Sequence, residues 1–249
     1  MSEPCSYAAL ARYYDAFTKN MDYKKRTDYI CTLLVRSGLK PNATLLDLAC
    51  GTGSFTLALA RRGYDMVGVD ASADMLTVAA LRSGPAPMFI CQHLEDLDLY
   101  GTAQGAVCLT DSVNHLTQPA RVRKFFRRLA LFLEPGAPFV FDVNTLHKHE
   151  RVLGDNTFIY EADGALCVWQ NRWDADAWTT QIDLDLFIEN EDGSYTRQQE
   201  SFSERAYTIE ELTAWLGKAG FAVEHVYGEL TQEPPREGEE RVYFVCRRK

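Results

Sequence analysis

The stretch Leu45–Ala60, LLDLACGTGSFTLALA, decides the fold. Its leucines form a short apolar run that predicts a buried strand, with Asp47 near the carboxyl end. Gly51 and Gly53 lack a Cβ, so the turn that follows can adopt positive φ and bring bare backbone against a ligand. A helix follows this turn and ends at Gly63. A strand, a glycine turn and a helix in this order are typical of the nucleotide-binding start of a doubly wound α/β sheet.

Two side chains near the turn narrow the choice of ligand. A dinucleotide-binding turn has a small third residue, where this chain has Thr56, and it faces a pyrophosphate, which the carboxylate of Asp47 would repel. Both features favour a ligand that has a cationic end and no phosphate. Asp70 ends the next apolar run, where a carboxylate can accept hydrogen bonds from both hydroxyls of a ribose. The alternative is a tight turn that binds nothing.

These residues resemble the class I S-adenosylmethionine-dependent methyltransferases. The segment D-L-A-C-G-T-G (47–53) is similar to the family's first motif, acidic-x-G-x-G-x-G, with Ala49 at the first glycine, and V-G-V-D-A-S-A-D-M-L (67–76) is similar to its second. The resemblance covers nearly the whole chain, and it is closest to small bacterial methyltransferases without an assigned acceptor. Sugar-amine and glycine N-methyltransferases are more distant. The resemblance implies an α/β fold with a doubly wound, mostly parallel seven-stranded sheet, and S-adenosylmethionine as methyl donor.

The resemblance also assigns cofactor-binding roles. The residues that it implies are Asp47, Ala49, Gly51, Gly53, Asp70, Ala71, Met75, His93, Leu94 and Asp111. The glycine turn and Asp47 would hold the methionine end, Asp70 the ribose, and Met75 with Leu94 the adenine. His93 stands where the family usually has an aspartate that accepts from the adenine amino group. A neutral imidazole can either accept or donate a hydrogen bond there.

Within the first 40 residues, Tyr7–Leu39 are predicted to be helical, with a break near residues 19–22. The resemblance implies that this segment is a lid, and that the tyrosine of Y-D-x-F contacts the methionine end of the cofactor. Tyr14 occupies that position, and Tyr23 is a candidate contact for the substrate. A tyrosine ring near a sulfonium contributes about 0.5–2 kcal/mol as a cation–π interaction. Packing of these aromatic residues against the sheet is the alternative.

A second polar stretch, T-D-S-V-N-H-L at 110–116, follows the fourth predicted strand. Ligands of an open α/β sheet bind outside the carboxyl ends of its strands, and this strand should neighbour the first. The family places its acceptor in a comparable stretch. The acceptor-side residues predicted here are His115 as general base, Asp111 and Asn114 as positioning residues, and Ser112 as a substrate contact. A helix cap or a surface histidine is the alternative for His115, and an acceptor that is already ionised would need no base.

From Asn144 the apolar pattern changes to period two. The segments that read as strands are 166–169, 180–188 and 195–206. Asp192-Gly193 provides a hairpin turn between the last two. We expect an antiparallel arm at about 145–207, inserted after the fifth strand of a single domain and covering the pocket. Arg205 and Tyr207, where the arm rejoins the sheet, are candidate substrate contacts or simply brace the arm.

Composition limits the partners and the compartment. The 249 residues carry a net charge of −9, which argues against a nucleic-acid backbone as partner because such sites need clustered Lys and Arg. Seven dispersed cysteines without a C-x-x-C pair favour a reducing compartment. No apolar run approaches the roughly 20 residues of a membrane span, and residues 1–10 lack a signal-peptide pattern. We therefore expect a cytoplasmic protein without a membrane partner, and no metal site is predicted.

The predicted function is S-adenosylmethionine-dependent methyl transfer to a nitrogen or oxygen of a small molecule, by in-line displacement that yields S-adenosylhomocysteine. Alignment of the reactants alone can supply about 7–11 kcal/mol. One alternative is a non-catalytic protein that binds the cofactor and acts through a partner. An oxidoreductase on the same fold is disfavoured by Thr56. An RNA methyltransferase is disfavoured by the acidic charge. The sequence does not predict the acceptor or the oligomeric state.

Overall fold

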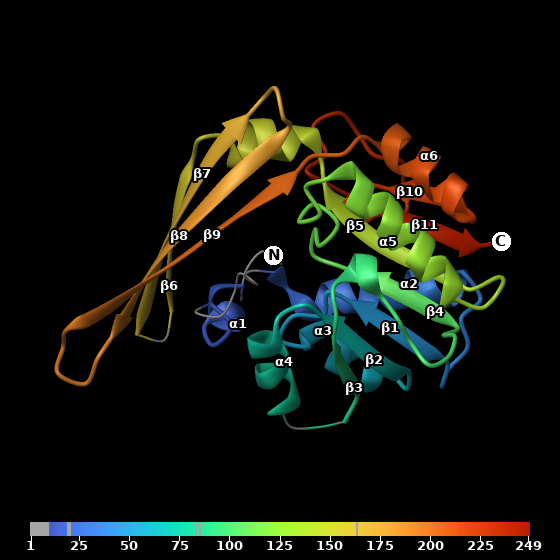
Figure 1. Ribbon diagram of the computed structural model, residues 1–249, viewed down its shortest axis with the longest axis horizontal. Coiled ribbons are helices and arrows are strands. Elements are labelled where there is room, and N and C mark those ends of the chain that lie inside the picture. Colours follow the sequence, from blue (N-terminus) through green and yellow to red (C-terminus); the bar gives the residue numbers. More distant parts are fainter. Residues whose placement is uncertain (1–9, 19–20, 83, 85, 163) are drawn as a thin grey trace.

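The computed structural model describes residues 10–18, 21–82, 84, 86–162 and 164–249. The chain forms two sheets (Figure 1). The larger has seven strands in the order β10-β11-β5-β4-β1-β2-β3, and the smaller has four in the order β6-β7-β8-β9. The predicted doubly wound, seven-stranded sheet with an antiparallel insertion after its fifth strand is therefore confirmed.

The strands of the large sheet are β1 (Thr44–Leu48), β2 (Asp65–Asp70), β3 (Met88–Cys91), β4 (Gly105–Cys108), β5 (Pro138–Asn144), β10 (Phe221–Tyr227) and β11 (Arg241–Arg248). The first five pair in parallel, whereas β11 runs antiparallel to β5 and β10. The connecting helices are α2 (Tyr23–Arg36), α3 (Ser54–Ala60), α4 (Ala73–Ala80), the short 3-10 helix η2 (Leu94–Asp96), α5 (Pro119–Leu131) and α6 (Ile209–Ala219). Because β1 pairs in parallel with both β2 and β4, the carboxyl ends of these three strands lie at the same edge of the large sheet.

Burial on both faces explains the apolar character of the central strands. Every residue of β5 is buried, and Phe139 and Phe141 pack with the apolar face of α5 and with α6. The other face packs against α2 and α3 (Figure 1). Val122, Phe125 and Phe126 form the apolar face of α5 and are fully buried. Helix α6 begins with a capping box of Thr208 and Glu211.

The N-terminal segment differs from the prediction. Residues 10–13 form turns, and helix begins only with α1 (Tyr14–Phe17), so the helix predicted from Tyr7 onward is wrong there. The physical reason is tertiary, because Leu10 packs into the core of the small sheet and its N–H donates to Glu200 Oε1 at 2.8 Å. The break before α2 is confirmed at Asp22, which caps that helix. Residues 1–9 and 19–20 of the predicted lid lie outside the described residues.

The small sheet consists of β6 (Thr157–Ala162), β7 (Ala165–Asp174), β8 (Thr179–Glu189) and β9 (Tyr195–Arg205). It extends away from the large sheet as an arm, with α1 close to it (Figure 1). The predicted turn at Asp192-Gly193 joins β8 and β9. Strand β6 and the π-helical η3 (Lys148–Leu153) were not predicted, because β6 has an exposed face and little apolar alternation. In the described part of the chain, no helix combines the length and apolar character needed to cross a membrane.

Candidate active site

The turn after β1 has an open side. Ala49, Gly51 and Gly53 all have positive φ, at 58°, 53° and 75°. A Cβ placed on Gly51 would have no heavy atom within 4 Å, whereas one on Gly53 would lie 3.1 Å from Ala79 Cβ. Gly51 therefore leaves space for a ligand against the backbone, and Gly53 is needed where α3 begins close to α4.

Asp70 holds this turn from the end of β2. Its Oδ2 accepts the N–H of Gly51 and its Oδ1 accepts the N–H of Ser72, each at 2.8 Å. Burial raises the pKa of the Asp70 carboxyl, and these backbone N–H groups oppose that shift. Each carboxylate oxygen has a further lone pair, so Asp70 can also accept from two ribose hydroxyls beside the open side of Gly51.

Thr56 explains why the turn departs from the dinucleotide pattern. Its Oγ1 donates to Asp47 Oδ2 at 2.5 Å, and both side chains are buried. Burial raises the pKa of the Asp47 carboxyl to about 7, although the bond from Thr56 lowers it. The polar side chain at position 56 thus satisfies an acid beneath the turn. The contact predicted between Asp47 and the methionine end stays a prediction.

The residues predicted around the adenine follow β2 and β3. Met75 and Leu94 are buried, at 3% and 7% exposure, in α4 and η2. His93 is half-buried and caps η2, and the carbonyl of Ala71 accepts from Cys91 Sγ at 3.6 Å. These residues follow β2 or its neighbour β3 in the chain, and their cofactor roles stay predictions.

Helix α1 is attached to the glycine turn by Asp15. The Oδ1 atom of Asp15 accepts from Thr52 Oγ1 at 2.8 Å and from Ser54 Oγ at 3.1 Å, and Oδ2 pairs with Arg82. Tyr14, next to Asp15, is half-buried. Burial and the nearby Tyr23, Asp111 and Asp70 raise the pKa of its hydroxyl. Tyr14 therefore keeps its proton and lies near both predicted halves of the site.

Tyr23, a predicted substrate contact, has internal partners. Its hydroxyl shares a hydrogen bond with Thr18 Oγ1 at 2.9 Å, and its ring lies 5.1 Å from that of Phe55. Burial raises the pKa of this hydroxyl. Tyr23 thus helps to join α1, α2 and α3, and its substrate role stays a prediction.

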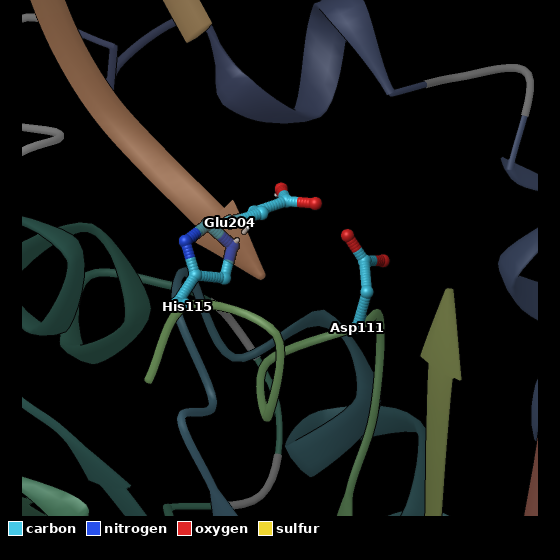
Figure 2. Close-up of side chains that lie close together, drawn as sticks. All are labelled: Asp111, His115 and Glu204. Carbon is cyan, nitrogen blue, oxygen red and sulfur yellow. Dashed lines mark ion pairs between the residues drawn. The ribbon is translucent and has the colours of Figure 1, made fainter. Parts of the chain in front are cut away.

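Asp111 and His115, which the sequence placed together, are joined by Glu204 at the end of β9. Figure 2 shows the three side chains converging. His115 Nε2 lies 3.6 Å from Glu204 Oε1, and the buried His149 has its Nε2 3.9 Å from Glu204 Oε2. Sequence reasoning missed Glu204 and His149. An acid on the same face as Phe202 of a period-two strand was the available signal for Glu204.

Burial shapes the charges of this cluster. It lowers the pKa of His115, which the charge of Asp111 opposes, and it lowers the pKa of His149 to about 4. Burial and the charge of Asp111 raise the pKa of Glu204 to about 8. At neutral pH both imidazoles are therefore uncharged, and the Glu204 carboxyl holds a proton for most of the time.

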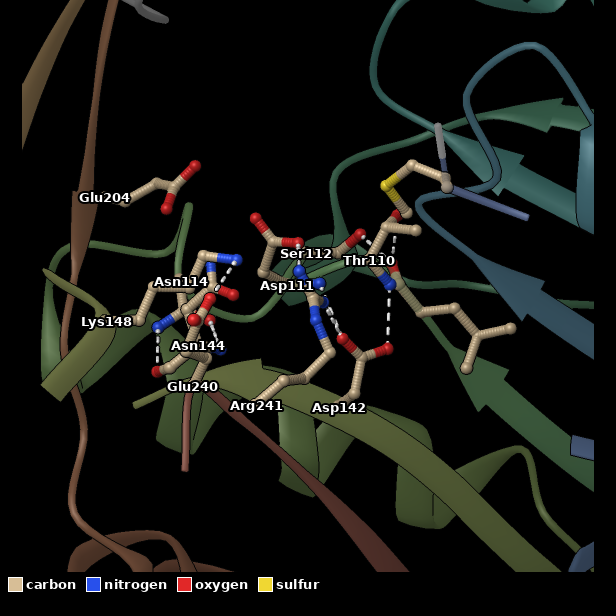
Figure 3. A network of polar contacts seen from close by, with 12 residues as sticks. Thr110, Asp111, Ser112, Asn114, Asp142, Asn144, Lys148, Glu204, Glu240 and Arg241 are labelled. Carbon is tan, nitrogen blue, oxygen red and sulfur yellow. Dashed lines mark hydrogen bonds and ion pairs between the residues drawn. The ribbon is translucent and has the colours of Figure 1, made fainter. Parts of the chain in front are cut away.

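Asp111 itself lies in a strained turn that a buried ion network holds (Figure 3). Thr110 and Asp111 have φ of 59° and 53°, and such residues cost of the order of 1–3 kcal/mol each. Asp142 accepts both of their N–H groups, at 2.7 and 3.0 Å. Arg241 pairs with Asp142 and donates to Asp111 Oδ1 at 2.7 Å. The turn is thus held at the carboxyl end of β4.

The same network ionises Asp111. Burial opposes its ionisation, but Arg241, His115 and Lys148 lower the pKa of the carboxyl to about 2. Asp142 and Arg241 were not predicted as site residues. The acid within the apolar fifth strand was a signal, whereas Arg241 reaches the site only because β11 pairs with β5.

Asn114 connects the turn at residues 110–116, called the acceptor turn after its predicted role, to both sheets. Its Nδ2 donates to the carbonyl of Arg205 at 2.9 Å and to that of Asn144 at 3.2 Å. Its Oδ1 accepts the N–H of Asn144 at 3.0 Å, and the side chain is fully buried. This geometry suits the positioning role predicted for it.

The other predicted substrate contacts also have internal partners. Ser112 Oγ donates to the carbonyl of Leu109 at 2.7 Å. The hydroxyl of Tyr207 donates to the carbonyl of Leu116. The guanidinium of Arg205 lies 4.6 Å from the Tyr207 ring centroid, next to α6. These contacts favour the bracing role of Arg205 and Tyr207 over a substrate role, which stays a prediction for all three.

The chain is similar to known proteins over most of its length. A family model described as a methyltransferase domain matches residues 45–136. A chain from Geobacillus sp. (strain WCH70), named as a methyltransferase without an acceptor, is 27% identical over 246 residues and covers 98% of this chain and 100% of its own. An amino-sugar enzyme of Streptomyces fradiae, dTDP-3-amino-3,6-dideoxy-alpha-D-glucopyranose N,N-dimethyltransferase, is 26% identical over 223 residues, which are 88% of this chain and 86% of its own.

The fold agrees over the whole length as well. The crystal structure of an S-adenosylmethionine-dependent methyltransferase from Clostridium acetobutylicum is 27% identical, has a TM-score of 0.84 and covers 97% of this chain and 98% of its own. The family match includes the glycine turn, Asp70 and the acceptor turn, and the similar crystal structure extends to the arm and the last strands. The chain is therefore an enzyme whose methyl donor is S-adenosylmethionine, and it belongs to the class I S-adenosylmethionine-dependent methyltransferases.

Proposed function

We propose that this enzyme methylates a nitrogen or oxygen nucleophile of a small polar molecule. The observation that carries the proposal is the cluster of Asp111, His115 and Glu204, in which an uncharged imidazole stands beside two carboxyl groups. It follows β4, the strand that pairs with β1 and so neighbours the glycine turn. The Streptomyces fradiae relative, whose name specifies an amino sugar, supports an amine as the acceptor.

The chain's own part in the reaction is to align the reactants. Bound S-adenosylmethionine supplies a methyl group that its sulfonium charge already activates. Asp70 would hold the ribose, and the open backbone at Gly51 would face the methionine end. We assign Tyr14 to the same end, because it lies near Asp70 and Asp111. Residues 1–40 as a lid belong to this proposal, supported by the contacts of Asp15 with the glycine turn. The arm at about 145–207 as a cover also belongs to it, supported by Glu204 of β9, which lies beside His115.

His115 is proposed as the general base. As the new bond to the methyl group forms, the acceptor loses a proton from its nitrogen or oxygen, and Nε2 of His115 takes it. The lowered pKa leaves the lone pair of this imidazole available at neutral pH. Asp111 and Asn114 position the turn that carries the base. A base in reach of the acceptor contributes about 10²–10⁴-fold to the rate.

Methyl transfer with a labelled donor tests this function. The purified protein is incubated with isotopically labelled S-adenosylmethionine and a panel of amino sugars, small amines and polyols, and products are identified by mass spectrometry. We expect one labelled methyl group per S-adenosylhomocysteine formed. His115→Asn should lower kcat by about 10²–10⁴-fold without changing the Kd for S-adenosylmethionine. His225→Ala, at an exposed histidine of β10, is the matched control.

Two results would overturn parts of the proposal. Binding of S-adenosylmethionine without turnover on the panel or on metabolite extracts would favour the non-catalytic alternative. Full kcat in His115→Asn would show that His115 is not the general base.

The net charge of −9 favours a small molecule over a nucleic acid as partner. The six described cysteines are free, which supports the cytoplasm as the proposed location.

A further inference from the structure

The cluster of Asp111, His115 and Glu204 has the composition of a metal-binding site. Each side chain offers one ligand atom, and these atoms lie within 4.8 Å of one another. They come from the turn after β4 and from the end of β9, and they point into one space (Figure 2). One imidazole nitrogen and two carboxylate oxygens are donors that suit first-row divalent cations such as Zn²⁺ and Mn²⁺.

The cluster contains a buried acceptor atom without a hydrogen-bond partner. Glu204 is 3% exposed, and its Oε2 has no hydrogen-bond partner among the described residues. Its neighbour His149 has Nε2 at 3.9 Å, beyond hydrogen-bond distance. A buried acceptor without a partner destabilises the folded chain, and a charged one does so more strongly, which is the cost of leaving it unsatisfied. A ligand that binds Glu204 would therefore remove this cost, which is an observation independent of the donor set.

The cations nearest to the cluster also pair with carboxylates outside it. Arg241 pairs with the buried Asp142, and Lys148 lies 3.6 Å from Glu240 (Figure 3). Arg241 also donates to Asp111, and among the described residues this hydrogen bond reaches Oδ1 and not Oδ2. Asp111 is ionised and shares Arg241 with Asp142, and Glu204 would release its proton when a cation binds, so the two carboxylates together can offset the charge of a divalent cation.

We propose that Asp111, His115 and Glu204 bind a divalent first-row transition-metal cation, with its remaining coordination positions open to water or to a small ligand. The side chains of Asp111 and His115 are 18% and 30% exposed, so the cation has access from that side. His149 lies behind Glu204, and its Nδ1 is 2.9 Å from Thr180 Oγ1, which fixes the orientation of its ring. Mg²⁺ should bind more weakly, because it prefers oxygen ligands only.

This inference does not rest on the proposed function. A bound cation occupies the lone pair of His115 Nε2, so in one molecule the imidazole either binds the metal or acts as the base. Methyl transfer measured with a chelator present tests the base alone. Metal binding measured without any acceptor tests the cation site alone.

Calorimetric titration of the full chain tests the site directly. The protein is treated with EDTA, desalted, and titrated with ZnCl₂ and, separately, with MgCl₂. The absorption spectrum with Co²⁺ reports whether nitrogen and oxygen ligands surround the metal. We expect one Zn²⁺ per chain. Glu204→Gln and His115→Asn should each raise the Kd for Zn²⁺ at least tenfold, because loss of a residue that only hydrogen-bonds a metal ligand already weakens metal binding by about 10–100-fold. His225→Ala should bind as the wild type does.

Binding of S-adenosylmethionine and the thermal unfolding curve show whether each variant is folded. If Glu204→Gln fails to fold, His115→Asn decides the question, because its side chain is the more exposed of the two. The inference is overturned if Zn²⁺ gives no saturable heat, if a folded variant that lacks one of the ligands keeps the wild-type Kd, or if His225→Ala loses the binding.

Discussion

Arg241 Nη2 lies 2.7 Å from Asp111 Oδ1 and so connects the last strand with the acceptor turn across 130 positions of the sequence. The same guanidinium pairs with Asp142, which accepts the N–H groups of Thr110 and Asp111. One buried cation therefore neutralises two acids, and one of those acids holds two residues in left-handed backbone. The proposed acceptor side of the site depends on a network that three separate segments supply.

Replacement of Arg241 should destabilise the protein strongly. Arg241→Met leaves the buried Asp142 without its cation, and breaking a buried pair costs about 3–5 kcal/mol in the free energy of unfolding. Urea unfolding measures this loss. Lys124→Met is the control, since Lys124 pairs with Asp96 at the surface and such pairs contribute about 0–1 kcal/mol. Equal losses in the two variants would contradict the structural role given to Arg241.

Asp70 should control the affinity for S-adenosylmethionine. Asp70→Ala removes the acceptor for the N–H groups of Gly51 and Ser72, and with it the group proposed to hold the ribose. We expect calorimetry to show a Kd raised roughly tenfold or more, because each charged hydrogen bond contributes about 1.5–3 kcal/mol. Asp98→Ala, at an exposed carboxylate, should leave the Kd unchanged. An unaltered Kd in Asp70→Ala would remove the ribose role.

The attachment of α1 to the glycine turn should slow the release of the cofactor. Arg82→Met removes the ion pair with Asp15, but it leaves the bonds that Thr52 and Ser54 donate. Because both side chains of the pair are partly exposed, its contribution is about 0–1 kcal/mol, which corresponds to at most about a fivefold faster dissociation of S-adenosylmethionine in stopped-flow experiments. Asp15→Asn, which weakens all of these contacts, should have a larger effect. Unchanged dissociation in both variants would show that α1 does not restrain the cofactor.

Glu204 should make stability depend on pH. Its pKa is about 8 in the folded chain, against an ordinary value of 4.5, so between these values the folded state holds a proton that the unfolded state has released. The free energy of unfolding therefore falls as pH rises through this window. Glu204→Gln lacks the titrating group, so its stability relative to the wild type should increase from about pH 5 to about pH 8.

Urea unfolding at several pH values in the presence of EDTA measures this difference between Glu204→Gln and the wild type. The chelator matters because a bound cation would keep Glu204 ionised. Glu161→Gln, in β6 of the arm, is the control, and it should follow the wild type at every pH. If the difference between Glu204→Gln and the wild type is constant across the range, the carboxyl is not protonated in the folded state.

The sequence by itself determined the seven-stranded α/β fold with its inserted arm, and the place of the glycine turn and Asp70 at one edge of the sheet. These features follow from local chemistry, because apolar periods, the positive φ that Gly51 and Gly53 adopt, and Asp70 at the end of an apolar run are all visible within a few residues. The acceptor turn with Asp111 and His115 was found in the same way. The short α1 was not, because contacts of Leu10 with the arm override helix propensity.

Only the tertiary structure decided how the acceptor side is built. Arg241 and Glu204 arrive there through the pairing of β11 with β5 and through the return of β9, and no local pattern reports which distant side chains a sheet will bring together. The tertiary structure also decided the charge states of Asp111 and Glu204, because desolvation and the nearest charged groups set the pKa of each carboxyl. Local stereochemistry therefore determined the cofactor side, and long-range packing determined the acceptor side.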